Sequence, residues 1–339
     1  MNQDMRMKPV RLLSAAVLAL LVSIAPLRAE GLIRIVQQFG TVFLPLDVIR
    51  DQHLVEKQGK ALGLDIKTEW HQLSGGAAVN DALLSGNIDI AGAGIGPFLT
   101  VWDRTLGTPV EVKVVGALGA QPNFLLTNKA SIKTLKDFSK SDKIAVPAAG
   151  ISVQSRILQI AAEQQFGRGH AHDLDDITVT LPHPEAAAGL ISGATEITGH
   201  VSNSPYQEKE LKDPKVHRIF SSYDVLGGKV TPTLLYALVK FRRDNPKTFQ
   251  AFVAALREAT AWIAAHPKEA AETFVRVENS KLSPDFVAST LEEPDVQFTV
   301  APLSSKKFAD FLFRIGAIKH HPASWKDYVF KELQSENGS

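Results

Sequence analysis

The stretch LLSGNIDIAGAGIGP, residues 83 to 97, has a similar counterpart later in the chain, LISGATEITGHVSNSP, residues 190 to 205. In both copies a helical pattern ends at Ser-Gly, a short strand pattern with one acidic residue follows, and small residues lead to a proline. Gly86 and Gly193 suit a helix C-terminus, where a positive φ angle costs glycine little. The repeat distance is too long for a solenoid, so the pattern indicates two similar α/β halves.

Around the two copies, short β-rich runs alternate with helix-period runs, which is typical of mainly parallel sheets covered by helices. The expected strands are residues 32–36, 64–70, 88–91 and 110–115 in the first set, and 143–146, 177–180, 195–198 and 216–220 in the second. Extended runs at 124–127 and 234–239 are expected to carry the chain across and back. The last third is expected to be helical, with Phe249, Phe252 and Leu256 on a buried face.

The first 29 residues are interpreted as an export signal and are set apart from the folded protein. A basic start at Arg6 and Lys8 precedes the apolar run 12–25, and Leu27-Arg28-Ala29 offers a cleavage site. The apolar run is shorter than the ~20 residues that a membrane-spanning helix needs. We therefore expect a protein of the periplasm.

Composition excludes several kinds of partner and chemistry. The net charge of +1 gives no electrostatic case for binding nucleic acid or an anionic membrane. The chain has no cysteine, so its stability must come from core burial rather than from disulfides. The signatures of zinc proteases, serine hydrolases and Walker-type nucleotidases are missing from the sequence. His170 and His172 lie in a polar run where a solvated loop is the simpler interpretation, so no metal and no cofactor are expected.

The glycines at 92, 94 and 96 raise the alternative of a dinucleotide-binding fingerprint. That fingerprint needs glycine at its first, third and sixth positions, and the sixth position counted from Gly92 is Pro97. We interpret the run instead as a loop at the carboxyl end of a strand, where small side chains let a ligand approach the N–H groups of the following helix.

Candidate ligand-binding residues are those that follow the expected strands, because ligands bind outside the carboxyl ends of strands in open α/β sheets. In the first half these are Gln38, Phe39, Gly40, Thr41, Phe43, Ser74, Gly75, Gly76, Gly94, Ile95 and Gly96, and in the second half they are Gly150, Ser152, Val153, Gln154, His200, Asn203 and Tyr223. Plainer interpretations stay open for some of them. Ser74 and Ser152 suit ordinary helix caps, Phe39 and Phe43 suit core positions, and histidines such as His200 are often surface or internally bonded groups.

Several short motifs also occur in a characteristic order. They are Phe43-Leu44-Pro45-Leu46, Ser74-Gly75-Gly76, Leu84-Ser85-Gly86-Asn87-Ile88-Asp89, Ser131-Ile132-Lys133-Thr134-Leu135-Lys136-Asp137-Phe138 and Asn245-Pro246. With these motifs the chain resembles the periplasmic substrate-binding proteins of ABC importers, in the nitrate, sulfonate, taurine and thiamine-precursor group. The run from Phe138 to Ile144 and the pair Glu196-Ile197 depart from the usual pattern of that group.

The resemblance implies an α/β, bilobed periplasmic-binding-protein fold of type II, with two mainly parallel sheets flanked by helices and a hinge of two crossing strands. Lobe 1 is expected to comprise residues 30–121 and 236–339, and lobe 2 residues 122–235. The chain would then be a monomer that captures a small organic anion, of the sulfonate, taurine or nitrate kind, in the cleft and delivers it to an ABC permease in the inner membrane.

Two alternatives stay open from the residues. One is an exported enzyme on the same bilobed scaffold, and the other is a binding protein for a neutral, pyrimidine-like heterocycle. An enzyme would need a cluster of titratable groups in its cleft, whereas the candidate loops carry mostly Gly, Ser, Thr, Asn and Phe. The sequence therefore favours solute binding over catalysis.

Overall fold

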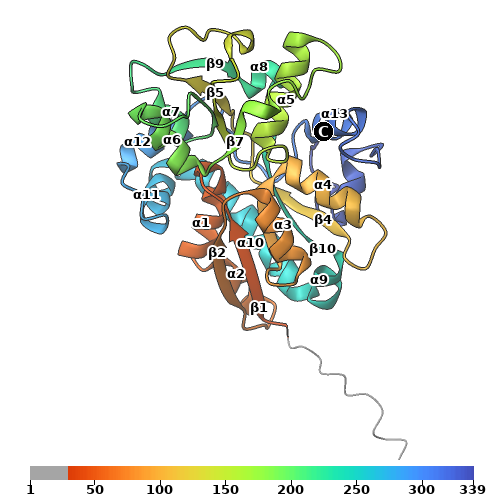
Figure 1. Ribbon diagram of the computed structural model, residues 1–339. Helices are drawn as coiled ribbons and strands as arrows, with labels where there is room; N and C mark the ends of the chain where they lie inside the picture. Colours follow the sequence, from red (N-terminus) through yellow and green to blue (C-terminus); the bar gives the residue numbers. More distant parts are fainter. Residues whose placement is uncertain (1–29) are drawn as a thin grey trace, which may run out of the picture. The chain divides into compact units, whose positions relative to one another are not determined.

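The computed structural model describes residues 30–339, and the expected export signal lies outside the described residues. Two five-stranded sheets form the framework (Figure 1). The first sheet has the order β2-β1-β3-β10-β4, with β1 at Leu32–Gln37, β2 at Lys67–Gln72, β3 at Ile90–Gly94, β4 at Val112–Ala117 and β10 at Thr233–Leu238. The second has the order β7-β6-β8-β5-β9, with β5 at Phe124–Thr127, β6 at Ile144–Val146, β7 at Thr178–Thr180, β8 at Gly199–Ser202 and β9 at His217–Ser221.

Each sheet contains one antiparallel strand in the same position. β1 pairs in parallel with β2 and β3, and β10 lies antiparallel between β3 and β4. In the second sheet β6 pairs in parallel with β7 and β8, and β5 lies antiparallel between β8 and β9. β5 is the strand on which the chain enters the second sheet, and β10 is the strand on which it returns to the first. The predicted fold class, two mainly parallel sheets with two crossing strands, is confirmed.

Helices cover both faces of each sheet. They are α1 (Leu44–Asp51), α2 (Leu54–Ala61), α3 (Gly76–Leu84), α4 (Ile95–Thr105), α5 (Val153–Phe166), α6 (His183–Ser192), α7 (Tyr206–Glu210), α8 (Ser222–Leu226), α9 (Val239–Asp244), α10 (Pro246–Ala265), α11 (Pro267–Val277), α12 (Pro284–Leu291) and α13 (Ser305–Arg314). Among residues 30–339, each helix is too short or too polar to cross a membrane.

The apolar faces of these helices form the core. Phe249 and Phe252 of α10 pack with Ile33 and Ile35 of β1 on one face of the first sheet, which confirms the predicted buried stripe. Phe98 of α4 belongs to the core cluster on the other face. In the second half, α5 and α6 each contribute to a separate apolar cluster against the sheet. Burial of apolar surface of this kind is the main source of stability for a chain without disulfides.

The residue boundaries expected for the two lobes remain a prediction. Residues 31–339 form one compact unit by their contacts, with no division at residues 122 or 236. The returning strand β10 starts at Thr233 and pairs with the first sheet along its length, so a boundary at 235/236 would fall inside a strand.

The strand predictions in the two copies of the repeated motif are displaced. β3 was expected at 88–91 and occupies Ile90–Gly94, and β8 was expected at 195–198 and occupies Gly199–Ser202. The acidic residues therefore precede the strands. Asp89 forms a bidentate ion pair with Arg34, whereas Glu196 is exposed. β-branched residues before β8 misled the prediction, because the hydroxyl of Thr195 accepts the N–H of Ile197 at 3.3 Å and stabilises a turn there.

The glycine-rich run after residue 90 is not a loop. Gly92 and Gly94 lie in β3, and Gly96 lies in the first turn of α4, which follows the strand directly. A Cβ atom added at Gly92 would lie 2.6 Å from the carbonyl oxygen of Val36 in the neighbouring strand. Glycine is therefore needed here for close packing inside the sheet.

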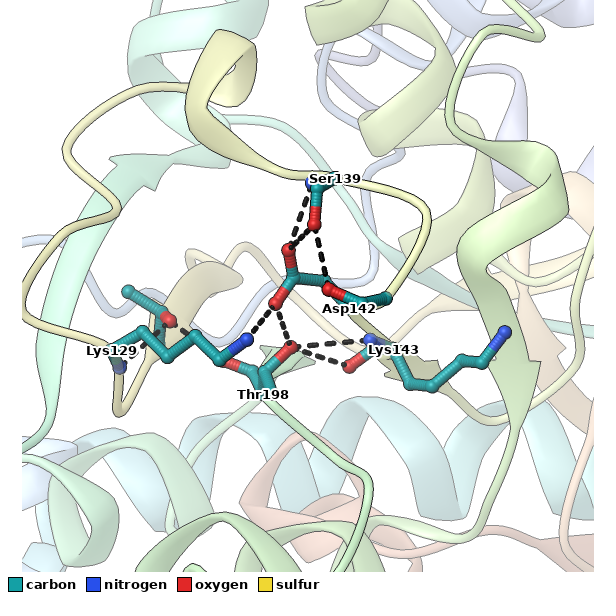
Figure 2. Close-up of polar contacts among 7 residues, drawn as sticks. Lys129, Ser139, Asp142, Lys143 and Thr198 are labelled. Carbon is teal, nitrogen blue, oxygen red and sulfur yellow. Dashed lines mark hydrogen bonds and ion pairs between the residues drawn. The ribbon is translucent and has the colours of Figure 1, made fainter.

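The segment before β6, which departs from the family pattern, has its own polar network (Figure 2). The Oδ2 atom of Asp142 accepts hydrogen bonds from the N–H and the hydroxyl of Ser139, both at 2.8 Å. Its Oδ1 atom accepts from Lys129 Nζ at 2.5 Å and from Thr198 Oγ1 at 3.1 Å. Burial by itself would raise the pKa of Asp142, but these hydrogen bonds outweigh burial and lower the pKa to about 2. The network joins the start of β6 to the turn that precedes β8.

Candidate ligand-binding site

A small cavity lies between the strand-end loops of the two sheets. Its volume is about 30 Å³. At ~10–15 Å³ for each water, that is room for roughly two water molecules. From the first half it is lined by Gln38, Phe39, Val42, Phe43, Ser74, Gly75, Gly76, Gly94, Pro97 and Thr233, and from the second half by Pro147, Ser152, Val153, Gln154, Pro182, His183 and Asn203. The cavity therefore lies where the carboxyl ends of β1, β2 and β3 meet those of β6, β7 and β8.

The structure brings many of the predicted residues together at this cavity. They are Gln38, Phe39, Phe43, Ser74, Gly75, Gly76, Gly94, Ser152, Val153, Gln154 and Asn203. Their role in ligand binding stays a prediction, and their convergence from two sheets is the geometry that such a role requires.

Other predicted residues are not part of this lining, and each has another contact or another place in the fold. The hydroxyl of Tyr223 donates to the carbonyl oxygen of Asp295 at 3.0 Å, and Thr41 contacts Gln121 at 3.2 Å. The N–H of Ile95 donates to the carbonyl oxygen of Pro232. The remaining cases are His200, buried within β8, Gly40 and Gly96, which contact the opposite half, and Gly150, which has open space beside it.

Several lining residues escaped the sequence analysis. They are Val42, Pro97, Pro147, Pro182, His183 and Thr233. His183, between two prolines, is the first residue of α6, and its side chain is buried at the cavity. Its position directly after the strand expected at 177–180 is the signal that would have identified it.

The N-terminus of α3 is occupied by a side chain from the neighbouring strand end. With the carboxamide oxygen of Gln38 turned toward α3, it accepts the N–H groups of Gly75 at 2.9 Å and Gly76 at 3.2 Å. Ser74 does not cap this helix, because the N-cap residue is Gly75, which has no side chain to accept an N–H of the first turn. Gln38 thus satisfies N–H groups that would otherwise face the cavity.

The N-terminus of α5 faces the cavity from the other half. Ser152 is its N-cap, and its hydroxyl accepts the N–H of Ser155 at 3.2 Å, as expected for an ordinary cap. The first N–H groups of a helix have no partner within the helix, and the helix dipole adds partial positive charge at this end. Val153 and Gln154, in the first turn of α5, line the cavity.

The cavity carries no formal charge at neutral pH. Among the described residues, those that line it include no Asp, Glu, Lys or Arg. His183 is the one titratable side chain of this lining, and its pKa is well below the usual value because burial disfavours the charged ring and His200 lies beside it. Polarity in the site therefore comes from amides, hydroxyls and helix ends.

The two halves touch around the cavity. Asn203 Nδ2 donates to the carbonyl oxygen of Phe39 at 3.1 Å, and the N–H of Thr41 donates to the carbonyl oxygen of Ser204 at 2.9 Å.

Residues 43–277 match the NMT1-like family. The chain belongs to this family. None of the curated proteins matches the sequence.

Solved structures of periplasmic binding proteins share the fold of this NMT1-like chain. The alkanesulfonate-binding protein SsuA from Xanthomonas axonopodis pv. citri, bound to MOPS, is 18% identical, with 89% of this chain and 99% of that chain covered and a TM-score of 0.68. The aliphatic sulphonate-binding protein SsuA from Escherichia coli is 17% identical, with 91% and 100% covered and a TM-score of 0.65. The nitrate-binding protein NrtA from Synechocystis PCC 6803 is 14% identical, with 90% and 87% covered and a TM-score of 0.68.

Proposed function

We propose that this chain is the extracytoplasmic solute-binding component of an ABC importer and that it captures a small organic anion in the cavity between its two halves. The observation that carries the proposal is the uncharged cavity at the facing strand ends, with the N-terminus of α5 directed at it. Since the cavity has room for only about two water molecules, the two halves would have to move apart to admit an organic anion. Helix N-termini bind anions without any basic side chain. The sulfonate-binding and nitrate-binding proteins of the same fold support this solute class.

Capture would involve closure of two lobes about the crossing strands. Lobe 1 would comprise residues 30–121 and 236–339, and lobe 2 residues 122–235, with β5 and β10 passing between them. The hydrogen bonds of Asn203 and Thr41 across the cavity rim would then form on closure. We expect a monomer in the periplasm that presents its closed form to the permease.

Catalysis is the weaker proposal for this site. General acid–base or nucleophilic chemistry needs at least two cooperating groups at the substrate, and His183 is the single titratable residue of the described lining. We therefore propose binding without turnover.

A neutral, pyrimidine-like heterocycle is the second candidate solute. The absence of charged side chains from the described lining favours it, since nothing there would compensate a full negative charge except helix ends and amides. Phe39 and Phe43 would supply aromatic contacts to such a ring.

A thermal-shift screen followed by calorimetry tests the proposal. The probes are taurine, isethionate, ethanesulfonate, nitrate and uracil. A specific solute at a hundredfold excess over its dissociation constant should stabilise the fold by ~2.7 kcal/mol. Stabilisation by uracil alone would establish the second candidate, and stabilisation by none of the probes would contradict both solute classes.

A charge placed in the cavity sharpens this screen. Ser74→Asp should abolish binding of the best anion through repulsion, because Ser74 is exposed at the cavity, while leaving the melting temperature of the free protein nearly unchanged. Ser289→Asp, at an exposed position of α12 outside the lining, is the matched control. Equal anion affinity in the Ser74→Asp variant would overturn the site.

A further inference from the structure

A chain of buried polar side chains runs from α7 to the cavity. Glu210 Oε1 lies 2.7 Å from His200 Nδ1, and His200 Nε2 lies 2.8 Å from His183 Nδ1. His183 Nε2 in turn lies 3.2 Å from Gln154 Nε2. The exposed fractions are 0% for Glu210 and His200, 3% for His183 and 6% for Gln154. Only the last two members line the cavity.

The chemistry of its first member fixes the direction of this chain. A carboxylate accepts hydrogen bonds, so with Glu210 ionised its contact places the proton of His200 on Nδ1. In a neutral imidazole the other nitrogen is then an acceptor, so His200 Nε2 receives the Nδ1–H of His183. By the same rule His183 Nε2 carries a lone pair, which accepts an amide hydrogen of Gln154.

The last link determines what Gln154 offers to the cavity. One amide hydrogen goes to His183 Nε2 and the other goes to Asn123 Oδ1 at 3.0 Å. Both donors of the carboxamide are thereby used, and the oxygen is the group that remains. Among residues 30–339, no group donates a hydrogen bond to Gln154 Oε1.

The opposite wall has the complementary polarity. Because the Gln38 oxygen accepts the N–H groups of Gly75 and Gly76, its amide nitrogen is left as a donor at the cavity. The unpaired N–H groups in the first turn of α5 are donors as well. A solute that makes hydrogen bonds to both walls of the cavity needs acceptor oxygens on the side of Gln38 and α5. On the side of Gln154 it needs an N–H or O–H group.

We propose that Glu210, acting through His200 and His183, holds Gln154 as a hydrogen-bond acceptor and so makes the cavity select solutes that carry a hydrogen-bond donor. This inference rests on the proposed function and narrows its solute class. The expected solute is a sulfonate with a hydroxyl or amino group rather than a plain alkanesulfonate or nitrate. Glu210 and His200 are positioning residues, since neither touches the cavity.

The opposite polarity of this hydrogen-bond chain would require one additional proton. To turn the Gln154 oxygen toward His183, the Nε2 atom of His183 must carry a proton, and His200 must then donate from its own Nε2. Such a state needs one added proton, on His200 or on Glu210. A proton on His200 would charge a buried imidazole, which burial disfavours, and a proton on Glu210 would remove the negative charge on which the proposed direction depends.

The direction of the chain is measured without any ligand. In the protein labelled with ¹⁵N-histidine, long-range ¹H–¹⁵N spectra at neutral pH should show a pyrrole-like Nδ1 and a pyridine-like Nε2 for His183. Signals are assigned from their loss in His183→Gln and His200→Gln. A pyrrole-like Nε2 on His183 in the unmodified protein would overturn the proposal.

The substitution Glu210→Gln tests whether the carboxylate sets the tautomer of His183. A carboxamide can donate as well as accept, so this variant removes the constraint, and His183 should show a mixture of both tautomers. Glu185→Gln, an exposed position on the helix that carries His183, should leave the His183 signals unchanged. Unchanged His183 tautomers in folded Glu210→Gln would contradict the role of Glu210.

Solute selection is measured with a matched pair, isethionate and ethanesulfonate, which differ by one hydroxyl. Calorimetry should show about tenfold tighter binding of isethionate, as expected for one net hydrogen bond. That preference should fall to near unity in Glu210→Gln and persist in Glu185→Gln. Equal affinities in the unmodified protein would contradict the selection. Failure of both sulfonates to bind would instead contradict the proposed solute class, and the spectra alone would then decide the direction of the chain.

Discussion

Gly96 in the first turn of α4 lies against the backbone carbonyl oxygen of Ile151, on the opposite side of the cavity. A Cβ atom added at Gly96 would come within 2.5 Å of that oxygen. Gly40 likewise lies against the backbone carbonyl oxygen of Ser204, whereas Gly94 lies against the side chain of Val153. Backbone atoms cannot move away as a flexible side chain can. These glycines of the first half therefore determine how closely the two halves can approach each other.

Gly96→Ala is expected to weaken solute binding at least tenfold because the added methyl group would hold the halves apart. The substitution should not destabilise α4 itself, since alanine is favoured over glycine in a helix by ~1 kcal/mol. Calorimetry with the best probe of the screen, together with the radius of gyration from small-angle scattering with and without that probe, measures the effect.

Gly150→Ala is the control for that experiment. A Cβ atom there meets nothing within 4 Å, and the positive φ of 72° adds only a local strain of ~1–2 kcal/mol. This variant should lose stability and keep its affinity. A Gly96→Ala protein with unchanged affinity and unchanged compaction would contradict the role of this contact.

Gln38→Glu tests whether an anion occupies the cavity. The glutamate keeps an oxygen acceptor for the N–H groups of Gly75 and Gly76 and adds a negative charge at a helix N-terminus, which favours the free protein by ~0.3–1 kcal/mol. The same charge should reduce the affinity for isethionate or taurine at least tenfold. Melting curves and calorimetry separate the two effects, and undiminished affinity for the anion would argue against anion binding there.

Asp142→Asn should destabilise the protein by about 2 kcal/mol at neutral pH, because the native state holds the pKa of Asp142 at about 2 against ~3.9 in an unfolded chain. The pKa of Asp142 is lower in the folded state than in the unfolded state. The stabilisation is therefore present above the pKa of the unfolded state and is lost as the pH falls through about 2. Urea unfolding of both proteins from neutral pH downward should show the difference shrinking. The exposed residue Asp176 offers the control Asp176→Asn, which should show little difference at any pH.

Asp47→Asn should stabilise the protein by about 1 kcal/mol at neutral pH. Burial, together with the nearby carboxylate of Glu278, raises the pKa of Asp47 well above its usual value. Its Oδ1 atom accepts from Gln37 Nε2 at 2.8 Å, while its Oδ2 atom has no partner among the described residues.

The pH dependence has the opposite sign to that of Asp142. When the pKa is raised in the folded state, the group contributes stability below the pKa of the unfolded state. That contribution is lost as the pH rises through the pKa of the folded state. Asparagine is neutral throughout, so the gain from Asp47→Asn should grow with pH. A loss of stability at neutral pH in thermal melts would contradict this account.

Local sequence patterns were sufficient for the framework. The strand at 124–127 was predicted with its observed bounds because a turn signal precedes four residues with high β propensity. Gly86 and Gly193 were predicted at helix ends and have φ angles of 75° and 63°. Strand β8 was misplaced because its position depends on pairing with β5 and β6, which are distant in sequence.

The sequence by itself determined the two-fold α/β pattern, the crossing strands and many of the strand-end residues that line the cavity, since all of these follow from periodicity and turn chemistry within a few residues. Tertiary structure alone decided which groups face the cavity. It placed His183 at the cavity and His200 behind it, and it set Gly96 against the opposite half rather than beside a solute. Those outcomes depend on how α4, α5 and α6 pack between the sheets, and no short stretch of sequence carries that information.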